Sequence, residues 1–490
     1  MTESGAAGTT VDTVIVGSGF AGLGAAIKLD EAGRRDWVLL EKAETLGGTW
    51  RDNRYPGCAC DVESHLYSFS FFPNDEWTRT FAPQAEIRSY LEDVADHYRL
   101  RDRIRFSSHV TGAEWDGTGW DVRLADGSAL RARYVVFGTG ALHEPSVPEI
   151  EGLDTFAGTA FHSAQWEHGH DLRGTRVAVI GTGASAIQFV PAIAGEVEHL
   201  TLFQRTAPWV LPKPDKPIRE RTRTAFRRVP GLRAAYRASL YWRHEAMVVG
   251  FLHPRIMKAA ERVARLYLRR RFAGDPELRK KVTPDFRMGC KRILMSNDYY
   301  PALRRDDVAV ETAGIERITE RGVVTTDGVE HEVDTIVFGT GFRVGDGMSR
   351  MAVTGRDGVK LADAWRDGPQ ALHGTTVAGF PNLFTLVGPN TGLGHSSMVL
   401  MIESQLNYVL DAMRMVEDNR AVAIDTVAAV QDDHNAELQR SLGAAVWGSG
   451  GCASWYLDEH GRNRTLWPGY TFTFRRRTRR ADPAAHELVA

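Results

Sequence analysis

Cysteine is scarce in this sequence, with four residues in a chain of 490. They are Cys58, Cys60, Cys290 and Cys452, and their spacing gives neither a CxxC redox motif nor a zinc site. So few thiols exclude a disulfide framework and are typical of a reducing compartment. The N-terminal stretch MTESGAAGTTVD is polar and carries an acid, unlike a signal peptide, so a cytoplasmic protein is expected.

Long hydrophobic runs and an excess of charge of one sign are also missing. The most apolar stretch, 14–29, is too short for a membrane span and is interrupted by glycines. The 60 basic and 62 acidic residues leave a formal net charge of −2, which favours neither nucleic acid nor an anionic membrane as partner. With 43% hydrophobic and 25% charged residues, we expect a globular protein of about three domains, without integral membrane association.

Glycine, by contrast, is concentrated in turns that follow predicted strands. Residues 11–16 and 37–40 have the pattern of buried strands, and 21–31 that of a helix between them. The turn before this helix fits GxGxxG and reads Gly17-Ser-Gly19-Phe20-Ala-Gly22. Its glycines allow a tight turn, close approach of a pyrophosphate and packing of the helix on the strand. With Glu41 placed to hold ribose hydroxyls, the pattern predicts a first dinucleotide site.

A second strand, turn, helix and strand follow at 176–203. The turn is a GxGxxA version of the same motif and reads Gly181-Thr182-Gly183-Ala-Ser185-Ala186. Its second strand is followed by Arg205 and Thr206 and not by an acid. An acid would repel a 2′-phosphate, whereas a guanidinium can hold it with two hydrogen bonds. This second site is therefore predicted to prefer NADPH over NADH.

Two such units predict an α/β fold with two Rossmann-like dinucleotide-binding domains. Similar segments, VVFGTG at 135–140 and TIVFGTG at 335–341, indicate that the chain crosses between the domains near 141–165 and 340–345. The first domain would then comprise residues 1–145 and 345–490, and the second domain residues 165–340.

Residues from about 213 to 286 are predicted to be a helical insertion in the second domain. They are rich in arginine and are broken by four prolines, Pro217, Pro230, Pro254 and Pro276. We expect a solvated insertion that covers the active site. A basic surface facing a membrane or a partner is the alternative.

Two further motifs carry a resemblance to a known family. Gly47-Gly48-Thr49-Trp50, followed by Tyr55-Pro56-Gly57 and Asp61, resembles the GGxW…[FY]PGxxxD signature of Baeyer–Villiger monooxygenases. The segment from Phe156 through Gly158 and His162 to Trp166 is similar to their FxGxxxHxxxW fingerprint, with Glu167 where the family usually has Pro or Asp. In that family the fingerprint lies on a linker between domains, which favours a structural role for His162.

The resemblance implies a reaction and its cofactors. The first site would bind FAD and the second NADPH. Reduced flavin and O2 would form a flavin C4a-peroxide, which inserts one oxygen atom beside a ketone carbonyl to give an ester or lactone. Arg292 would stabilise the peroxide anion, since arginine stays protonated. Asp61 would hold Arg292 near the flavin, and Lys291 would help Arg205 bind the 2′-phosphate.

The expected site residues are thus Arg292 and Asp61 for catalysis, with a larger set for cofactor binding and none for a metal. The cofactor set is Gly17, Gly19, Phe20, Gly22, Glu41, Lys42, Gly48, Thr49, Trp50, Tyr55, Asp61, Gly181, Thr182, Gly183, Ser185, Ala186, Arg205, Thr206, Lys291, Gly341 and Asn390.

Asn390 and His395 belong to the segment GPNTGLGH (388–395), which precedes a predicted helix at 398–410. The N-terminus of that helix would direct N–H groups toward the anionic side of the flavin. His395 is expected to cap the helix, with contact to flavin or substrate as the alternative. Aromatic residues also gather at 454–469, where plain packing and a contribution to the substrate pocket are both open.

Other functions fit less well. An N- or S-oxygenating flavin monooxygenase is the main alternative, but Trp166 and the Lys291-Arg292 pair speak against it. A disulfide reductase needs two cysteines about five positions apart beside the flavin, which Cys58-Ala-Cys60 does not supply. A non-catalytic NADPH-binding protein would keep the glycine turns but would have no use for Asp61 and Arg292. A small ketone and O2 are therefore the expected partners.

Overall fold

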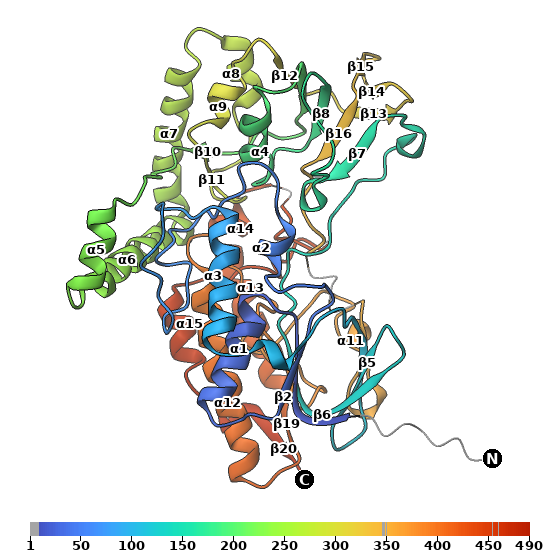
Figure 1. Ribbon diagram of the computed structural model, residues 1–490, viewed down its shortest axis with the longest axis vertical. Coiled ribbons are helices and arrows are strands. Elements are labelled where there is room, and N and C mark those ends of the chain that lie inside the picture. The colour runs from blue at the N-terminus through green and yellow to red at the C-terminus, as the bar shows by residue number, and fades with distance from the viewer. Residues whose placement is uncertain (1–8, 345–347, 349, 453, 459) are drawn as a thin grey trace.

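A parallel core and an antiparallel flank make up the larger sheet of the computed structural model (Figure 1), which describes residues 9–344, 348, 350–452, 454–458 and 460–490. Its strand order is β17-β4-β5-β6-β1-β2-β3, and β18 also pairs with β6. These strands are β1 (Thr9–Val16), β2 (Trp37–Leu40), β3 (Ile104–Arg105), β4 (Val110–Trp115), β5 (Trp120–Leu124), β6 (Ala129–Phe137), β17 (Ala352–Thr354) and β18 (Leu383–Thr385).

Helices cover this sheet because its parallel strands are apolar on both faces. Ile15 of β1 pairs with Leu39 on one side and Val136 on the other. Three helices lie over one face: α1 (Phe20–Glu31), α3 (Gln84–His97) and α12 (Met398–Asp418) (Figure 1). Most of α1 is buried, since it lies between the sheet and α12.

The second sheet is parallel throughout, in the order β12-β9-β8-β16-β7. Its strands are β7 (Thr159–His162), β8 (Arg176–Ile180), β9 (His199–Phe203), β12 (Val308–Glu311) and β16 (Thr335–Phe338). The helices α4 (Ala186–Ile193) and α9 (Tyr299–Ala302) lie beside it, together with a small antiparallel sheet, β13 (Ile315–Ile318), β14 (Gly322–Thr325) and β15 (Glu330–Glu332). Both predicted strand, turn and helix units are confirmed.

The predicted helical insertion is confirmed as four helices at one side of the molecule (Figure 1). They are α5 (Glu220–Arg228), α6 (Leu232–Leu252), α7 (Pro254–Arg271) and α8 (Pro276–Val282). Pro254 and Pro276 occupy first helical positions, where no backbone N–H is needed. Among the described residues, no helix has the length and apolar character that crossing a membrane requires.

The chain passes between the sheets twice, after β6 and after β16, and the two passages are joined to each other. Ser146 N donates to Gly341 O over 2.9 Å, and Arg343 N donates to Glu144 O over 2.9 Å. Pro145 and Phe342 form an antiparallel bridge between these bonds. The predicted boundary at residue 345 lies outside the described residues.

The C-terminal part adds helices beside the first sheet and the insertion. Its elements are α11 (Leu361–Ala364), β19 (Ala423–Thr426), α13 (Ala428–Ala444), α14 (Val446–Ser449), α15 (Thr471–Arg477) and β20 (His486–Val489).

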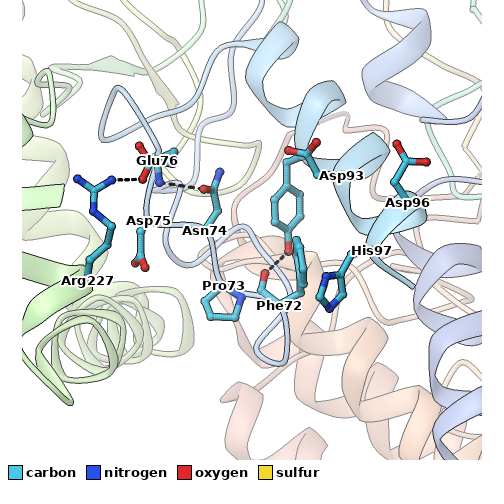
Figure 2. A pocket seen from close by; sticks show the side chains of 10 residues that line it. Phe72, Pro73, Asn74, Asp75, Glu76, Asp93, Asp96, His97 and Arg227 are labelled. Atoms are coloured by element: carbon cyan, nitrogen blue, oxygen red, sulfur yellow. Dashed lines mark hydrogen bonds and ion pairs between the residues drawn. The ribbon is translucent and has the colours of Figure 1, made fainter. Parts of the chain in front are cut away.

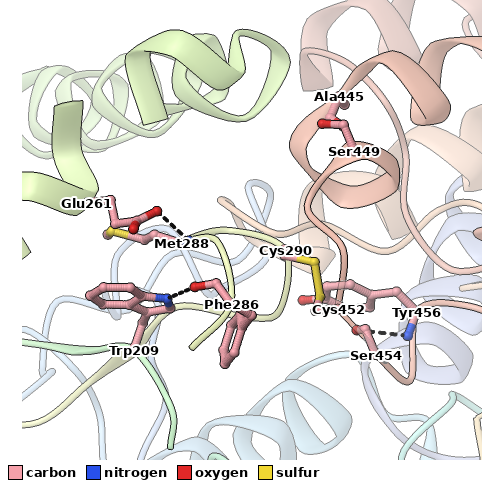
Figure 3. Close-up of a disulfide and its surroundings, with 10 residues drawn as sticks. All are labelled: Trp209, Glu261, Phe286, Met288, Cys290, Ala445, Ser449, Cys452, Ser454 and Tyr456. Atoms are coloured by element: carbon pink, nitrogen blue, oxygen red, sulfur yellow. Dashed lines mark hydrogen bonds between the residues drawn. A yellow bond between two sulfur atoms is a disulfide. The ribbon is translucent and has the colours of Figure 1, made fainter. Parts of the chain in front are cut away.

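The interpretation of the cysteines was wrong for one pair. Cys290 and Cys452 form a disulfide across 162 positions (Figure 3), whereas Cys58 and Cys60 are buried free thiols. Sequence spacing carries no information about this pair, because a disulfide depends on the distance between Cα atoms in the fold.

Candidate active site

The first glycine turn has no room for side chains. Gly17 follows β1 with a φ of +97°, and a Cβ there would lie 2.8 Å from Gly138 O. A Cβ on Gly22 would collide with the carbonyl of Gly17. The turn therefore requires glycine at both positions.

A second turn comes close to the start of α1. Gly48 has a φ of +51°, and a Cβ built on it would lie 3.1 Å from the Cα of Gly19. Gly19 precedes α1, and no side chain of the described residues caps the N–H groups of the first turn, which begins at Phe20. Bare backbone with uncapped N–H groups at the positive end of a helix dipole fits a pyrophosphate.

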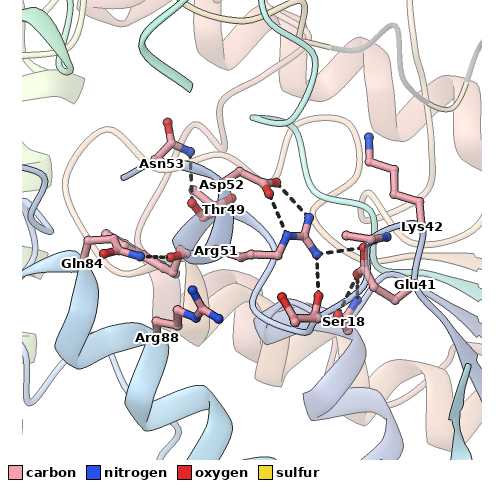
Figure 4. A network of polar contacts seen from close by, with 12 residues as sticks. Ser18, Glu41, Lys42, Thr49, Arg51, Asp52, Asn53, Gln84 and Arg88 are labelled. Carbon is pink, nitrogen blue, oxygen red and sulfur yellow. Dashed lines mark hydrogen bonds and ion pairs between the residues drawn. The ribbon is translucent and has the colours of Figure 1, made fainter. Parts of the chain in front are cut away.

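Glu41 follows β2 and is buried in a network of donors (Figure 4). One carboxylate oxygen accepts from Ser18 N at 2.9 Å and Ser18 Oγ at 2.6 Å; the other accepts from Ala43 N and from Arg51 Nη1, each at 2.9 Å. Burial alone would raise the pKa of Glu41, but the Ser18 and Ala43 hydrogen bonds and the Arg51 charge lower it. Glu41 is thus a carboxylate fixed at the predicted ribose position.

The other residues predicted around this turn differ in their surroundings. Lys42 lies at the surface, 3.5 Å from Glu144. Trp50, in α2 (Thr49–Asp52), donates from Nε1 to Tyr67 OH over 3.1 Å. Thr49 begins this short helix directly after Gly48.

Tyr55 links the first nucleotide unit to the second. Its hydroxyl donates to Gln188 Oε1 over 3.1 Å, and Gln188 also exchanges hydrogen bonds with the backbone of Ala59. Gln188 lies in α4, the helix that follows the second glycine turn. Gln188 could not be identified from the sequence, because its role depends on contact between the two units.

The second glycine turn repeats the geometry of the first. Gly181 has a φ of +108°, and a Cβ there would lie 2.5 Å from Gly339 O. Thr182 Oγ1 donates to Thr206 O over 2.9 Å, which connects the turn to the end of β9. Gly183 and Ser185 complete the turn, and Ala186 begins α4, where its methyl group lies close to Gly339.

Positive charge collects beside this turn. Arg205 is exposed just after β9. Burial lowers the pKa of Lys291, and the nearby Arg205 guanidinium lowers it further. Two cations close enough to repel each other form a place where a phosphate would be attracted.

Asp61 and Arg292 form an ion pair between the two units. Arg292 Nε donates to Asp61 Oδ2 over 2.9 Å, and Nη2 donates to the same oxygen. Burial raises the pKa of Asp61, but Arg292 and then Lys213 outweigh this and lower it. Asp61 in turn raises the pKa of Arg292, so the pair stays ionised. Lys213, which donates to Cys60 O over 3.1 Å, was missed because it lies in the insertion's ordinary basic background.

Asn390 is buried, with a φ of +56°. Its Nδ2 donates to Asn463 O at 2.8 Å and Leu466 O at 3.0 Å, while its Oδ1 has no hydrogen-bond partner among the described residues. Gly341, with a φ of +82°, lies in the second passage between the sheets.

The expectation that His395 caps α12 was wrong. Ser397 precedes the helix, and its Oγ accepts from Val399 N over 3.3 Å. The His395 ring is buried instead, with Nε2 3.9 Å from Glu245 Oε1 of α6. Ser397 is favoured because its short side chain reaches the first turn of the helix.

His162 and Trp166 of the fingerprint lie at the passages between the sheets. His162 Nδ1 accepts from Ala164 N over 3.1 Å, and its ring is edge-on to Phe342 of the second passage. Trp166 packs against Phe161 and Phe189.

A surface pocket of about 490 Å³ lies elsewhere, beside α3 and α5 (Figure 2). None of the predicted site residues lines it. Three of its carboxylates, on Asp75, Glu76 and Asp96, are already paired with arginines. Its lining is Phe72, Pro73, Asn74, Asp75, Glu76, Tyr90, Asp93, Asp96, His97 and Arg227.

Comparison with known proteins agrees with this geometry. The family model described as pyridine nucleotide-disulphide oxidoreductase matches residues 14–234, a range that contains neither cysteine of the disulfide. The crystal structure of OTEMO in complex with FAD and NADP superposes with a TM-score of 0.89 and 27% identity, covering 98% of this chain and 100% of that one. Cyclohexanone monooxygenase from Rhodococcus sp. Phi1, bound to NADP+, gives a TM-score of 0.87 and 31% identity, covering 99% and 100%.

A Baeyer–Villiger monooxygenase of Pseudomonas aeruginosa is 51% identical over 479 residues, which cover 97% of this chain and 91% of that protein. Identity of this extent includes both nucleotide units, the insertion and the C-terminal helices. The chain therefore belongs to the Baeyer–Villiger monooxygenase family.

Proposed function

We propose that this protein uses FAD, NADPH and O2 to insert one oxygen atom beside a ketone carbonyl, giving an ester or lactone. The observation that carries the proposal is the ionised Asp61–Arg292 pair, placed between two glycine turns that are each shaped for a dinucleotide. Family membership indicates the class of reaction, and the Asp61–Arg292 pair indicates where in the protein the reaction would take place.

The two turns divide the cofactors between them. Gly17, Gly19 and Gly48 would hold the pyrophosphate of FAD, and the fixed carboxylate of Glu41 would accept from its ribose. Because all four donors to Glu41 come from the protein, one of them must give way to the ribose. Two of the four donors, Ser18 Oγ and Arg51 Nη1, belong to side chains, which can turn away when the ribose binds.

At the second turn, Gly181 and Gly183 would hold the pyrophosphate of NADPH, while Arg205 and Lys291 would bind its 2′-phosphate. Tyr55 and Gln188 connect the two sites, because their hydrogen bond joins the first unit to α4. Phe20, Lys42, Thr49, Trp50, Thr182, Ser185, Ala186, Thr206, Gly341 and Asn390 complete the proposed binding surfaces.

We also propose the division of the chain into domains. Residues 1–145 and 345–490 would form the FAD domain, since β17 and β18 join the first sheet. The NADPH domain would extend to residue 340. It would begin at about residue 159 and not at 165, because β7 pairs with β16.

When bound, FAD accepts a hydride from NADPH and activates O2. Arg292 supplies a permanent positive charge for the negative charge that develops on oxygen during attack on the carbonyl carbon. Asp61 positions the guanidinium and keeps it protonated. A cytoplasmic location suits NADPH as reductant and forms part of the proposal.

The test is product analysis with purified protein, FAD, NADPH and ¹⁸O₂. Cyclohexanone, 2-decanone, acetophenone and progesterone serve as ketones, and thioanisole as a thioether. We expect at least one ketone to gain one labelled oxygen atom as an ester or lactone. Labelled sulfoxide with every ketone unchanged would overturn the proposal in favour of the heteroatom-oxygenating class.

A further inference from the structure

The disulfide between Cys290 and Cys452 joins two segments that are 162 positions apart in the sequence (Figure 3). The Cα atoms of the two cysteines are 6.3 Å apart. One segment leads from the insertion to Arg292, and the other follows α14. The reaction as proposed gives this crosslink no role.

The first segment is held by hydrogen bonds to Trp209 and Glu261 before Cys290, and again to Trp209 after Arg292. Phe286 O accepts from Trp209 Nε1 over 3.0 Å, and Met288 N donates to Glu261 Oε2 over 3.3 Å. Leu294 N donates to Trp209 O over 2.9 Å, where β11 (Leu294–Met295) begins. Cys290 therefore fixes the last anchored position before Lys291 and Arg292.

The second segment is held against the first by close packing. Gly450 has no space for a side chain, since a Cβ there would lie 2.6 Å from Cys290 Cβ. Trp447 of α14 stacks on Phe251 of α6 with ring centroids 5.2 Å apart. The chain then runs through Cys452 to Tyr456.

Tyr456 brings this segment to the catalytic pair. Its side chain is 2% exposed, and it interacts electrostatically with both Arg292 and Asp61. Burial raises the pKa of its phenol to about 12, so it stays neutral beside the ion pair. Arg292 and Asp61 are only partly buried, with side chains 34% and 28% exposed, so their position depends on the segments that flank them.

We propose that Cys290 and Cys452 form a thiol–disulfide site that controls how efficiently NADPH oxidation is coupled to ester formation. In the disulfide form, the crosslink holds Cys452 against Cys290, two positions before Arg292. In the dithiol form, the two segments separate, Arg292 is held less firmly at the pair, and reduced cofactor is consumed by O2 with release of hydrogen peroxide. The inference rests on the proposed function.

The exchange balances with a dithiol as reductant. Its thiolate attacks Sγ of Cys452, the partly exposed residue of the two, and Cys290 leaves as a thiolate that takes up a proton. The second thiol of the reductant then displaces Cys452. The reductant becomes a cyclic disulfide, and the protein gains two electrons and two protons as two thiols. Cys58 and Cys60 take no part, because burial raises the pKa of both thiols.

The experiment compares holoenzyme before and after dithiothreitol. Alkylation in denaturant, followed by peptide mass analysis, should find Cys58 and Cys60 free before reduction and all four cysteines free afterwards. Reduction should lower the ester formed per NADPH at least threefold, with a matching rise in hydrogen peroxide. Anaerobic reduction of FAD by NADPH should change less than twofold. The substrate is whichever panel ketone is converted.

Two variants sharpen the test. Cys452→Ser should have the low coupling of the reduced enzyme and should not respond to dithiothreitol, whereas Cys58→Ser should still respond. If Cys452→Ser does not fold, the comparison of oxidised and reduced wild type stands alone.

The inference is overturned if the cysteines remain free after treatment with the thiol oxidant diamide, or if coupling is the same in both forms. Failure of the proposed function has a separate signature, namely no ester in either form. Hydrogen–deuterium exchange of the peptide spanning 446–458 then tests the inference without turnover. Faster exchange after reduction supports the proposal that the disulfide holds this peptide in place, and equal exchange before and after reduction overturns the proposal.

Discussion

Arg292 directs Nε and Nη2 at a single carboxylate oxygen of Asp61, although 231 positions separate the two residues in the chain. The loop after the first glycine turns supplies Asp61, and the segment after the helical insertion supplies Arg292. The catalytic charge is therefore assembled only when the two nucleotide units are packed together.

Replacing Arg292 by alanine should separate the two halves of the reaction. The variant should still oxidise NADPH, because that step does not use the Arg292 charge, but ester formation should fall by about 10²–10³-fold. Hydrogen peroxide should rise in proportion. Gas chromatography of the ester and a peroxide assay check this, and Arg292→Lys should recover part of the ester yield. Normal ester yield from Arg292→Ala would rule out the assignment.

Replacing Arg205 by alanine should change the choice of reductant. Loss of one charged hydrogen-bonding partner of the 2′-phosphate should raise the KM for NADPH about 10–100-fold. The KM for NADH should change little, since NADH has no 2′-phosphate. Steady-state kinetics with both reductants measure the effect. Arg173→Ala, on an exposed arginine paired with Asp171, is the matched control; equal shifts for both reductants would contradict the role of Arg205.

Gly22→Ala should empty the FAD site. A methyl group at this position would collide with the carbonyl of Gly17, and relief would displace α1 at a cost of about 1–3 kcal/mol. The ratio of flavin absorbance at 450 nm to protein absorbance at 280 nm should fall severalfold in the purified variant. Gly443→Ala adds a methyl group where no atom of the described residues outside its own helix lies within 4 Å, and it should retain full flavin content. Full flavin in Gly22→Ala would show that the turn tolerates a side chain.

The buried pair Glu63–His244 should make stability depend on pH. His244 Nε2 lies 2.6 Å from Glu63 Oε2. Burial lowers the pKa of His244, but the Glu63 carboxylate has the larger effect and raises that pKa above 6.5. Burial raises the pKa of Glu63, but His244 has the larger effect and lowers that pKa. The histidine contribution is complete below pH 6.5 and is lost as the pH rises through the raised pKa. The Glu63 contribution is present above its ordinary value of 4.5 and is lost as the pH falls through its lowered pKa.

His244→Gln should therefore cost about 3 kcal/mol of unfolding free energy at pH 6 and clearly less at pH 9. Urea unfolding at both pH values measures this difference. A cost that is independent of pH would mean that folding does not raise the pKa of His244. Gln439→Ala, a partly exposed position outside this network, controls for the general effect of pH on the variants.

Much of the fold could be predicted because local sequence patterns determine its strands and turns. The strands at 37–40 and 176–180 have the bounds that their apolar patterns predicted, and each is placed by a neighbouring glycine turn. Gly17 and Gly181 were identifiable for the same reason, since a positive φ at a fixed position after a strand requires glycine.

The parts that escaped prediction depend on contacts between distant segments. Gln188 meets Tyr55 only when the two units pack, and nothing within α4 marks it. Cys290 and Cys452 have no local pattern that pairs them. His395 was assigned to a helix end that Ser397 occupies, because burial beneath Glu245 is not visible in the sequence. The Asp61–Arg292 pairing was inferred only through family resemblance.

The two passages between the sheets are hydrogen bonded to each other through Ser146 and Gly341 and through Arg343 and Glu144. A two-stranded ribbon bends easily across its flat face and resists both twisting and sliding of one strand along the other. The paired passages therefore favour a swinging motion of the two halves over a twist. The Tyr55–Gln188 hydrogen bond and the Asp61–Arg292 ion pair also join the halves, so a swing that separates the nucleotide turns must break both.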